Sequence, residues 1–75
     1  MLSFGERIHV MRRRRGMTQA ALASAVGMNS NFLARVERGD VKDVAGQLVA
    51  KLAQALGCST DYLLGLADDT DEEAA

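Results

Sequence analysis

The chain has 75 residues, which is enough for one small domain with an economical core. Apolar residues make up 48% of it, Pro is absent, and aromatic residues are scarce, so we expect helices packed on aliphatic side chains. A single Cys and a single His exclude an internal disulfide and argue against a Cys/His metal cluster. No apolar run approaches the ~20 residues of a membrane span. We therefore expect a cytoplasmic or nucleoid-associated protein of a bacterium or phage, with no metal and no cofactor.

Charge is distributed unevenly along the chain. Residues 1–66 hold nine basic and five acidic residues, a formal charge of +4, although the whole chain has a formal charge of −1. The other five acidic residues fall between positions 68 and 73, in a stretch without apolar periodicity. The body therefore favours a polyanionic partner, and residues 67–75 are predicted to form a disordered acidic tail.

The first predicted helix covers residues 3–15, because apolar side chains recur there at helical spacing: Phe4, Ile8 and Met11. Ser3 and Glu6 have the spacing of a capping box at its start. Gly16 is suited to end it in the left-handed conformation. Cations in the last turn, Arg12 to Arg15, also suit the negative end of the helix dipole.

Two short helices are predicted next, over residues 18–26 and 30–38. Thr18 caps the first, and either Asn29 or Ser30 caps the second. A glycine follows each helix, and the turn between them has about three residues. The expected inward side chains are Leu22, Ala23, Val26, Leu33 and Val36. This pattern is typical of a helix-turn-helix unit.

The remaining helices are predicted over residues 45–56 and 60–65. The apolar stripe of the longer one is formed by Leu48, Leu52, Ala53 and Leu56. Ser59 or Thr60 caps the last helix, whose apolar side chains are Tyr62, Leu63 and Leu64. We expect Tyr62 in the core with its hydroxyl reaching solvent, Cys58 buried, and His9 exposed. The fold class is thus all-α, a compact five-helix bundle within residues 1–66.

The outer face of the helix over 30–38 has the chemistry of base recognition. With Leu33 and Val36 turned inward, Ser30, Asn31 and Arg35 turn outward and Phe32 lies at the boundary. Asn pairs with adenine and Arg with guanine through two hydrogen bonds each, and Phe suits contact with a thymine methyl group. The predicted base-reading residues are Ser30, Asn31, Phe32 and Arg35.

Several stretches, in this order and at compatible spacing, resemble the lambda-repressor-like (Cro-type, XRE-type) helix-turn-helix family. They are Met17-Thr18-Gln19-Ala20-Ala21-Leu22-Ala23, Val26-Gly27-Met28-Asn29, Val36-Glu37-Arg38-Gly39, and the run from Leu52 through Ala55-Leu56-Gly57 to Leu64. The resemblance covers about residues 4–66. It implies a five-helix bundle whose third helix enters the major groove of DNA.

The resemblance also implies roles for single positions. Arg12 and Glu37 match an internal salt bridge between the first and third helices. Ser30, Asn31 and Arg35 match base-reading positions. The candidate phosphate-binding residues are Thr18, Gln19, Asn29, Arg38, Lys42 and Arg14. One departure is the segment after Gly39, where Asp40 and Asp43 stand instead of the basic residues and Pro that are common in the family.

Together these observations predict a transcriptional regulator that binds double-stranded DNA sequence-specifically. Of the two kinds of regulator, we expect a repressor rather than an activator. We expect a homodimer on an inverted-repeat operator with half-sites about 34–36 Å apart. The dimer contact falls either to the last two helices or to Val41 and Val44. The chain is either complete and Cro-like or one domain of a larger protein.

The alternative is a protein-interaction module on the same fold, such as an antitoxin or anti-repressor component, which the acidic residues after Gly39 and in the tail suggest. The tail either competes with DNA for the basic face or only aids solubility. The sequence has no nucleophile–base pair and no phosphate-binding loop, so we expect neither an enzyme nor a small-molecule ligand.

Overall fold

A computed structural model describes residues 2–67 of the chain. Within that range it contains five α-helices and no β-strand, so the predicted all-α class is confirmed. The helices are α1 (Phe4–Arg14), α2 (Gln19–Val26), α3 (Ser30–Arg38), α4 (Gly46–Leu56) and α5 (Thr60–Leu63). Residues 68–75, which hold all but the first position of the predicted acidic tail, lie outside the described residues.

Local sequence signals set most of the helix ends. The backbone N–H of Glu6 donates to Ser3 Oγ (3.2 Å) and that of Ser3 donates to Glu6 Oε1 (2.8 Å), which confirms the capping box. Thr18 caps α2 as predicted, and the structure selects Asn29 and Ser59 from the alternatives for α3 and α5. The helices α2, α3 and α4 each end at a glycine in the left-handed conformation.

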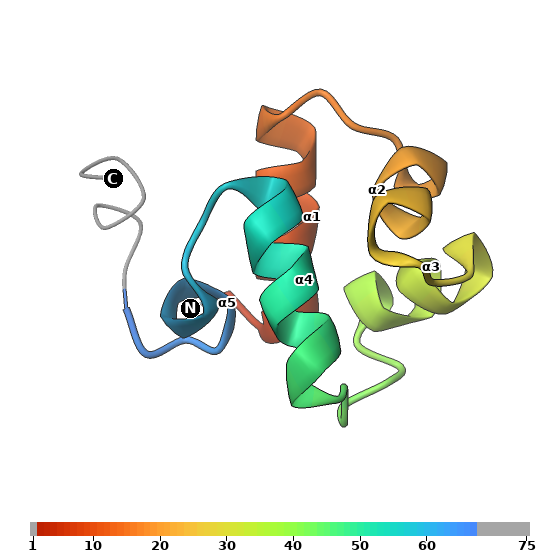
Figure 1. The fold of residues 1–75 in the computed structure, drawn as a ribbon. Coiled ribbons are helices and arrows are strands. Elements are labelled where there is room, and N and C mark those ends of the chain that lie inside the picture. Colours follow the sequence, from red (N-terminus) through yellow and green to blue (C-terminus); the bar gives the residue numbers. More distant parts are fainter. Residues whose placement is uncertain (1, 68–75) are drawn as a thin grey trace.

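The helices form a bundle with α1 and α4 at its centre (Figure 1). α2 and α3 lie on one side of this pair, and α5 lies on the other side beside the N-terminal segment. α1 packs against α3, α4 and α5, whereas α2 is held between α3 and α4. The helix-turn-helix unit therefore rests on a scaffold made by the other three helices.

The core is aliphatic, as predicted, with one fully buried aromatic residue, Tyr62. Its other members are Ile8, Met11, Leu22, Ala23, Val26, Leu33, Val36, Val49, Leu52, Ala53, Leu56 and Leu63. The expectation that the Tyr62 hydroxyl reaches solvent was wrong, because no part of the side chain is exposed. The guanidinium carbon of Arg7 lies 4.7 Å from the centre of the Tyr62 ring and closes this end of the core by a cation–π contact.

Two predicted apolar stripes needed correction. In α4, Val49 is buried and Leu48 only half-buried, because Val49, Leu52, Ala53 and Leu56 follow the i, i+3, i+4, i+7 pattern and Leu48 lies at its edge. The last helix is shorter than predicted, since Gly65 takes a φ of +80° directly after the Leu64 cap. Leu64 follows the last helical residue and is 54% exposed, whereas Tyr62 and Leu63 are buried. Cys58 is half-buried rather than buried.

α1 approaches the end of α3 closely at Gly5. A Cβ atom at this position would overlap the backbone oxygen of Val36 and lie 2.7 Å from that of Glu37. No side chain larger than hydrogen fits there without moving the α3 backbone. The sequence analysis did not single out Gly5, which sets the distance between the first helix and the third.

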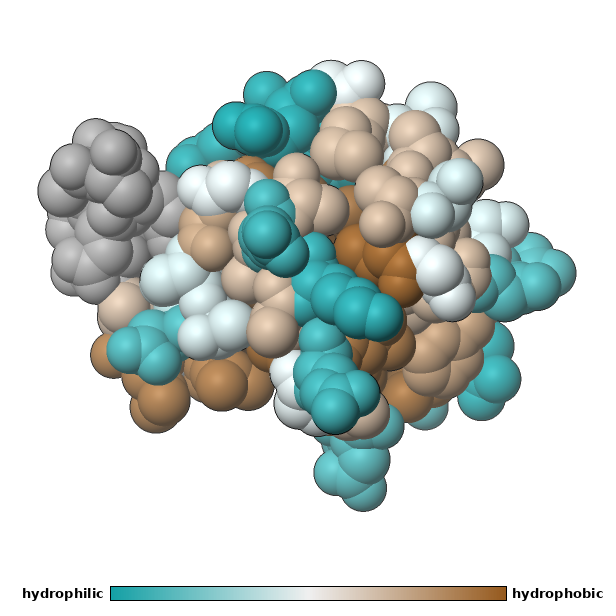
Figure 2. Space-filling view, viewed as in Figure 1, coloured by the Kyte–Doolittle hydropathy of each residue, from teal (hydrophilic) through white to brown (hydrophobic). Residues whose placement is uncertain are grey.

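The surface of the molecule divides by chemistry (Figure 2). Hydrophilic residues gather over the C-terminal end of α1, where Arg13, Arg14 and Arg15 are exposed. Hydrophobic residues gather over α5 and the residues that follow it. The exposed large apolar side chains of the described residues are Leu2, Leu64 and Leu66. None of the described helices has the length and hydropathy that a bilayer crossing requires.

Candidate nucleic-acid interface

α3 has one buried face and one exposed face. Leu33, Val36 and Glu37 point into the molecule. Ser30, Asn31 and Arg35 are all exposed. Asn31 and Arg35 lie one helical turn apart on the opposite face, and Ser30 is exposed as the first residue of the helix. The structure thus brings three of the four predicted base-reading residues together on the accessible side of the predicted recognition helix.

Phe32, the fourth predicted base-reading residue, is half-buried and packs against the hydrophobic core. It lies at the boundary between the two faces, as predicted. Asn29 starts the helix by accepting a hydrogen bond from the backbone N–H of Asn31 (2.7 Å). Anchoring at this end fixes where the exposed residues of the first turn lie.

The candidate phosphate-binding residues are spread over several elements. Thr18 accepts from the backbone N–H of Ala21 (3.0 Å), so its hydroxyl oxygen serves the α2 cap. Arg14, Asn29 and Lys42 are exposed. Arg38 is exposed as well, and its Nε donates to Asp40 Oδ2 at 3.2 Å, an ion pair that offsets part of its charge. The acidic residue in this pair, Asp40, is one of the two that depart from the family pattern after Gly39.

The buried face of the same region contains the ion pair implied by the family resemblance. Arg12 donates from Nε to Glu37 Oε2 (2.8 Å) and from Nη2 to Glu37 Oε1 (3.1 Å). The two side chains are 9% and 4% exposed. Arg12 also donates from Nη1 to the backbone oxygen of Met17 (2.9 Å), which ties the α1–α2 turn to the pair.

Two further side chains reach Glu37. Gln19 donates from Nε2 to Glu37 Oε1 (3.1 Å), so this predicted phosphate-binding side chain is turned toward the ion pair. His9 Nδ1 lies 3.1 Å from the same oxygen. The sequence analysis described His9 only as an exposed residue, although its position three residues before Arg12 places both on one face of α1. The carboxylate therefore joins α1, α2 and α3.

Electrostatics keep this carboxylate ionised. Burial alone would raise the pKa of Glu37, but hydrogen bonds from Arg12, Gln19 and His9, together with the charge of Arg12, lower it below 4.5 overall. At neutral pH the group is an anion enclosed by donors. It positions the first turn of α2 against the last turn of α3.

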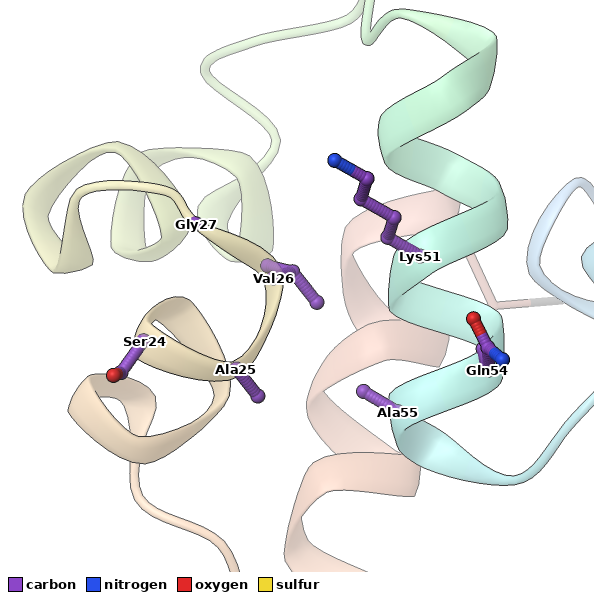
Figure 3. A pocket seen from close by; sticks show the side chains of 7 residues that line it. All are labelled: Ser24, Ala25, Val26, Gly27, Lys51, Gln54 and Ala55. Carbon is purple, nitrogen blue, oxygen red and sulfur yellow. The ribbon is translucent and has the colours of Figure 1, made fainter.

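Two surface hollows adjoin the helix-turn-helix unit. One, of about 420 Å³, lies where α1, the start of α2 and the outer side of α3 meet, and is lined by Glu6, His9, Gln19, Ala34, Glu37 and Arg38. The other, of about 660 Å³, lies between α2 and α4. There Ala25 and Val26 face Ala55 across the hollow and Lys51 contributes one ionisable side chain (Figure 3). Its lining has no set of converging titratable groups, and no metal-binding cluster of His, Cys, Asp or Glu occurs among residues 2–67.

The two segments predicted as alternative dimer contacts lie at one surface. Val44, from the loop before α4, and Leu64, from the end of α5, line the same small hollow together with Phe4, Lys42 and Val49. Val44 and Phe4 are half-buried. The two alternatives therefore meet at one apolar patch, formed by Phe4, Val44 and Leu64, whereas Val41 lines a neighbouring hollow with Val36 and Gly39.

The fold and this arrangement are those of a helix-turn-helix DNA-binding class of domain. Residues 3–66 match a family model described as a helix-turn-helix domain, and the chain belongs to this family, in its lambda-repressor-like branch.

Two curated relatives have the same helix-turn-helix region. The chain is 40% identical over 60 residues to the repressor protein C2 of Salmonella phage P22, covering 80% of this chain and 27% of that protein. It is 36% identical over 64 residues to the HTH-type transcriptional regulator ImmR of Bacillus subtilis (strain 168), covering 85% of this chain and 50% of that protein. The chain therefore spans half or less of the length of these relatives.

Solved structures with the same fold include protein–DNA complexes. The P22 c2 repressor in complex with a synthetic operator superposes with a TM-score of 0.81 at 34% identity, covering 89% of this chain and 100% of that one. The biofilm regulator SinR in complex with DNA superposes with a TM-score of 0.76 at 27% identity, covering 80% of this chain and 95% of that one.

Proposed function

We propose that this chain is the DNA-binding part of a transcriptional repressor and that it reads duplex DNA in the major groove with α3. The observation that carries the proposal is the exposure of Ser30, Asn31 and Arg35 on α3, while the Arg12–Glu37 ion pair on the buried side of the helix holds α3 in place. The P22 and SinR domains, which share the fold, have been solved on DNA. Binding rather than catalysis is the activity that this surface supports.

In this proposal the exposed side chains of α3 divide the work of recognition. Asn31 pairs with an adenine edge and Arg35 with a guanine edge, each contributing about 1–3 kcal/mol of discrimination between bases. Ser30 adds a hydroxyl that serves as donor or acceptor. Phe32 packs beside them at the rim and contacts a thymine methyl group or a sugar.

Phosphate contacts fix the orientation of the domain on the duplex. The amides at the start of α2 supply donors at the positive end of a helix dipole, next to Thr18 and Gln19. Gln19 Nε2 donates one of its two hydrogens to Glu37, so we assign its phosphate contact to the second N–H of the amide and to the backbone N–H. Arg14, Asn29, Arg38 and Lys42 extend the contacts, with Arg38 weakened by its pairing with Asp40.

We further propose that two copies bind an inverted repeat through the apolar patch of Phe4, Val44 and Leu64. A domain of this size makes few base contacts by itself, and a two-fold dimer doubles them. Within the patch Leu64 is exposed and Phe4 and Val44 are half-buried, and none of the three belongs to α3.

A protein-interaction module is the second candidate. The Arg38–Asp40 pair favours it, because it places a carboxylate where a phosphate clamp is expected. The two functions differ in their response to salt. A DNA reader loses affinity steeply as salt rises, since each phosphate that it neutralises releases counterions.

The test is selection on randomised duplexes, followed by affinity measurements on the enriched sequence over a range of salt. A roughly palindromic motif with a steep salt dependence supports the proposal. Arg35→Ala should then relax the preference at one base position while leaving the others. If no sequence is preferred over bulk DNA at moderate salt, the proposal fails and the result supports the second candidate, a protein-interaction module.

A further inference from the structure

His9 occupies the wall of the 420 Å³ hollow between α1, the start of α2 and the outer side of α3. Its Nδ1 lies 3.1 Å from Glu37 Oε1 and 3.2 Å from Arg12 Nη2. About half of the side chain, 47%, is exposed. Since Nδ1 is turned to the buried carboxylate, Nε2 lies on the side of the ring away from it.

The two neighbours of Nδ1 require different protonation states of this nitrogen. The Arg12 guanidinium only donates, so it requires an Nδ1 lone pair, whereas the Glu37 carboxylate only accepts, so it requires an Nδ1 proton. One nitrogen cannot satisfy both contacts at once. The neutral Nε2–H tautomer accepts from Arg12 at Nδ1, whereas the imidazolium form donates from Nδ1–H to Glu37. In both forms Nε2–H is an outward donor.

The charged groups around His9 determine what the outward donor attracts. α1 contributes Glu6, Arg12 and Arg13, and α3 contributes Glu37 together with Arg38, while Gln19 of α2 is neutral. Glu37 is matched by Arg12, and the Glu6 carboxylate accepts from the Ser3 backbone in the capping box. An anion that enters the hollow therefore meets the positive end of the α2 dipole, the His9 ring and Arg38, whose charge Asp40 partly offsets, with the Glu6 carboxylate also at the wall.

We propose that His9 is a further DNA contact, whose Nε2–H donates to a backbone phosphate oxygen, and that the domain takes up a proton at His9 when it binds duplex DNA. This inference rests on the proposed function and adds a residue to its phosphate-binding surface. The incoming phosphate stabilises the imidazolium form, in which Glu37 accepts from Nδ1–H and the phosphate accepts from Nε2–H. Operator affinity then rises as the pH falls.

The chain has one histidine, so substitution of a single residue isolates the effect. Affinity for the selected duplex is measured at constant salt between about pH 5.5 and 8, the range in which histidines titrate. The wild-type dissociation constant should increase with pH, by at most about tenfold per pH unit for one linked proton. His9→Gln, which retains a polar side chain but does not titrate, should bind with a much flatter pH dependence.

Two controls separate a phosphate contact from a structural role. His9→Lys keeps a positive charge across the range, so it should retain affinity at high pH while losing the pH dependence. Calorimetry of binding in two buffers with different ionisation enthalpies should report proton uptake for the wild type and none for His9→Gln. Unfolding in urea at each pH verifies that the variants are folded under the binding conditions.

The outcomes distinguish this inference from the function on which it rests. Equal pH dependence in wild type and His9→Gln, with sequence-specific binding intact, overturns proton uptake at His9. Equal proton uptake by the two proteins does the same. Equal affinity of the two proteins at every pH overturns the phosphate contact as well. If the wild type binds no duplex specifically at any pH, the proposed function fails and this inference fails with it.

Discussion

At the scale of single residues, one carboxylate connects three helices. Glu37 of α3 accepts hydrogen bonds from Arg12 of α1 and Gln19 of α2, with His9 of α1 at 3.1 Å. The family resemblance predicted the Arg12–Glu37 pair, because both positions match a motif. It did not predict that Gln19 turns inward, since that contact depends on how α2 packs against α3. The positions of side chains on α3 follow from periodicity, but their bonding partners follow from tertiary packing.

Replacing Glu37 with Ala should lower the free energy of unfolding by about 3–5 kcal/mol, because Arg12 is then left buried without its counter-charge. Urea unfolding followed by circular dichroism measures the change. The matched control is the double variant Arg12→Met, Glu37→Leu, which removes both charges and should regain much of the lost stability. A single-variant loss below about 1 kcal/mol would show that the pair is more hydrated than its burial indicates.

Acid should also weaken the fold through Glu37. The pKa of Glu37 is lower in the folded protein than its ordinary value of 4.5, so its stabilising contribution is fully present above 4.5 and is lost as the pH falls through the lower, folded value. We expect the free energy of unfolding to decrease below about pH 4.5. Parallel urea titrations of the wild type and Glu37→Gln measure this, and the variant should show a smaller decrease. Identical slopes would assign the acid sensitivity to other groups.

At the scale of helices, most helix ends could be predicted from the sequence, whereas the contacts between helices could be predicted less well. Caps and terminal glycines act locally, which is why the predicted start of α2 and the glycine ends of α2, α3 and α4 agree with the structure. In α4 three of the four predicted stripe residues are buried, and Val49 takes the place of Leu48, because Val49 continues the i, i+3, i+4, i+7 pattern of Leu52, Ala53 and Leu56. Gly5 carries no local signal at all. Its requirement arises from the backbone of α3, which is distant in sequence.

Gly5→Ala should destabilise the domain, although alanine is the better helix former, because the added methyl group overlaps the Val36 and Glu37 backbone oxygens. Overpacking of this kind costs about 1–3 kcal/mol. Gly46→Ala is the matched control, since a methyl group at the start of α4 meets no atom within 4 Å and should be neutral or stabilising. Thermal unfolding of both variants tests the comparison. Equal stability of the two would mean that α1 moves away from α3 at little cost.

At the scale of the whole molecule, the class of fold was predictable because two short helices, a three-residue turn and flanking apolar helices fit few other arrangements. The surface that we propose for dimer contact was predicted only as two alternatives, since Val44 and Leu64 are 20 positions apart and only the folded chain brings them to one patch with Phe4. The recognition face and this patch involve different elements. They should therefore respond separately to mutation.

Leu64→Asp should weaken pairing of two copies on DNA without altering contact with a single half-site. The carboxylate would face its symmetry mate across an apolar contact, where like charges repel and lose hydration. Affinity for a full palindrome and for one half-site, measured by fluorescence anisotropy, gives the comparison. We expect the advantage of the full site to shrink by about tenfold or more, the equivalent of ~1.4 kcal/mol. An equal fall on both sites would place Leu64 in the fold rather than in the dimer contact.

The two faces of α3 have a consequence for how this domain evolves. The side chains that hold α3 in the bundle, Leu33, Val36 and Glu37, are distinct from the exposed ones at positions 30, 31 and 35. Substitutions at the exposed positions remove no core contact, so, under the proposed function, a population of variants can explore new operators while every member still folds. New binding specificity thus requires no intermediate that has lost its structure.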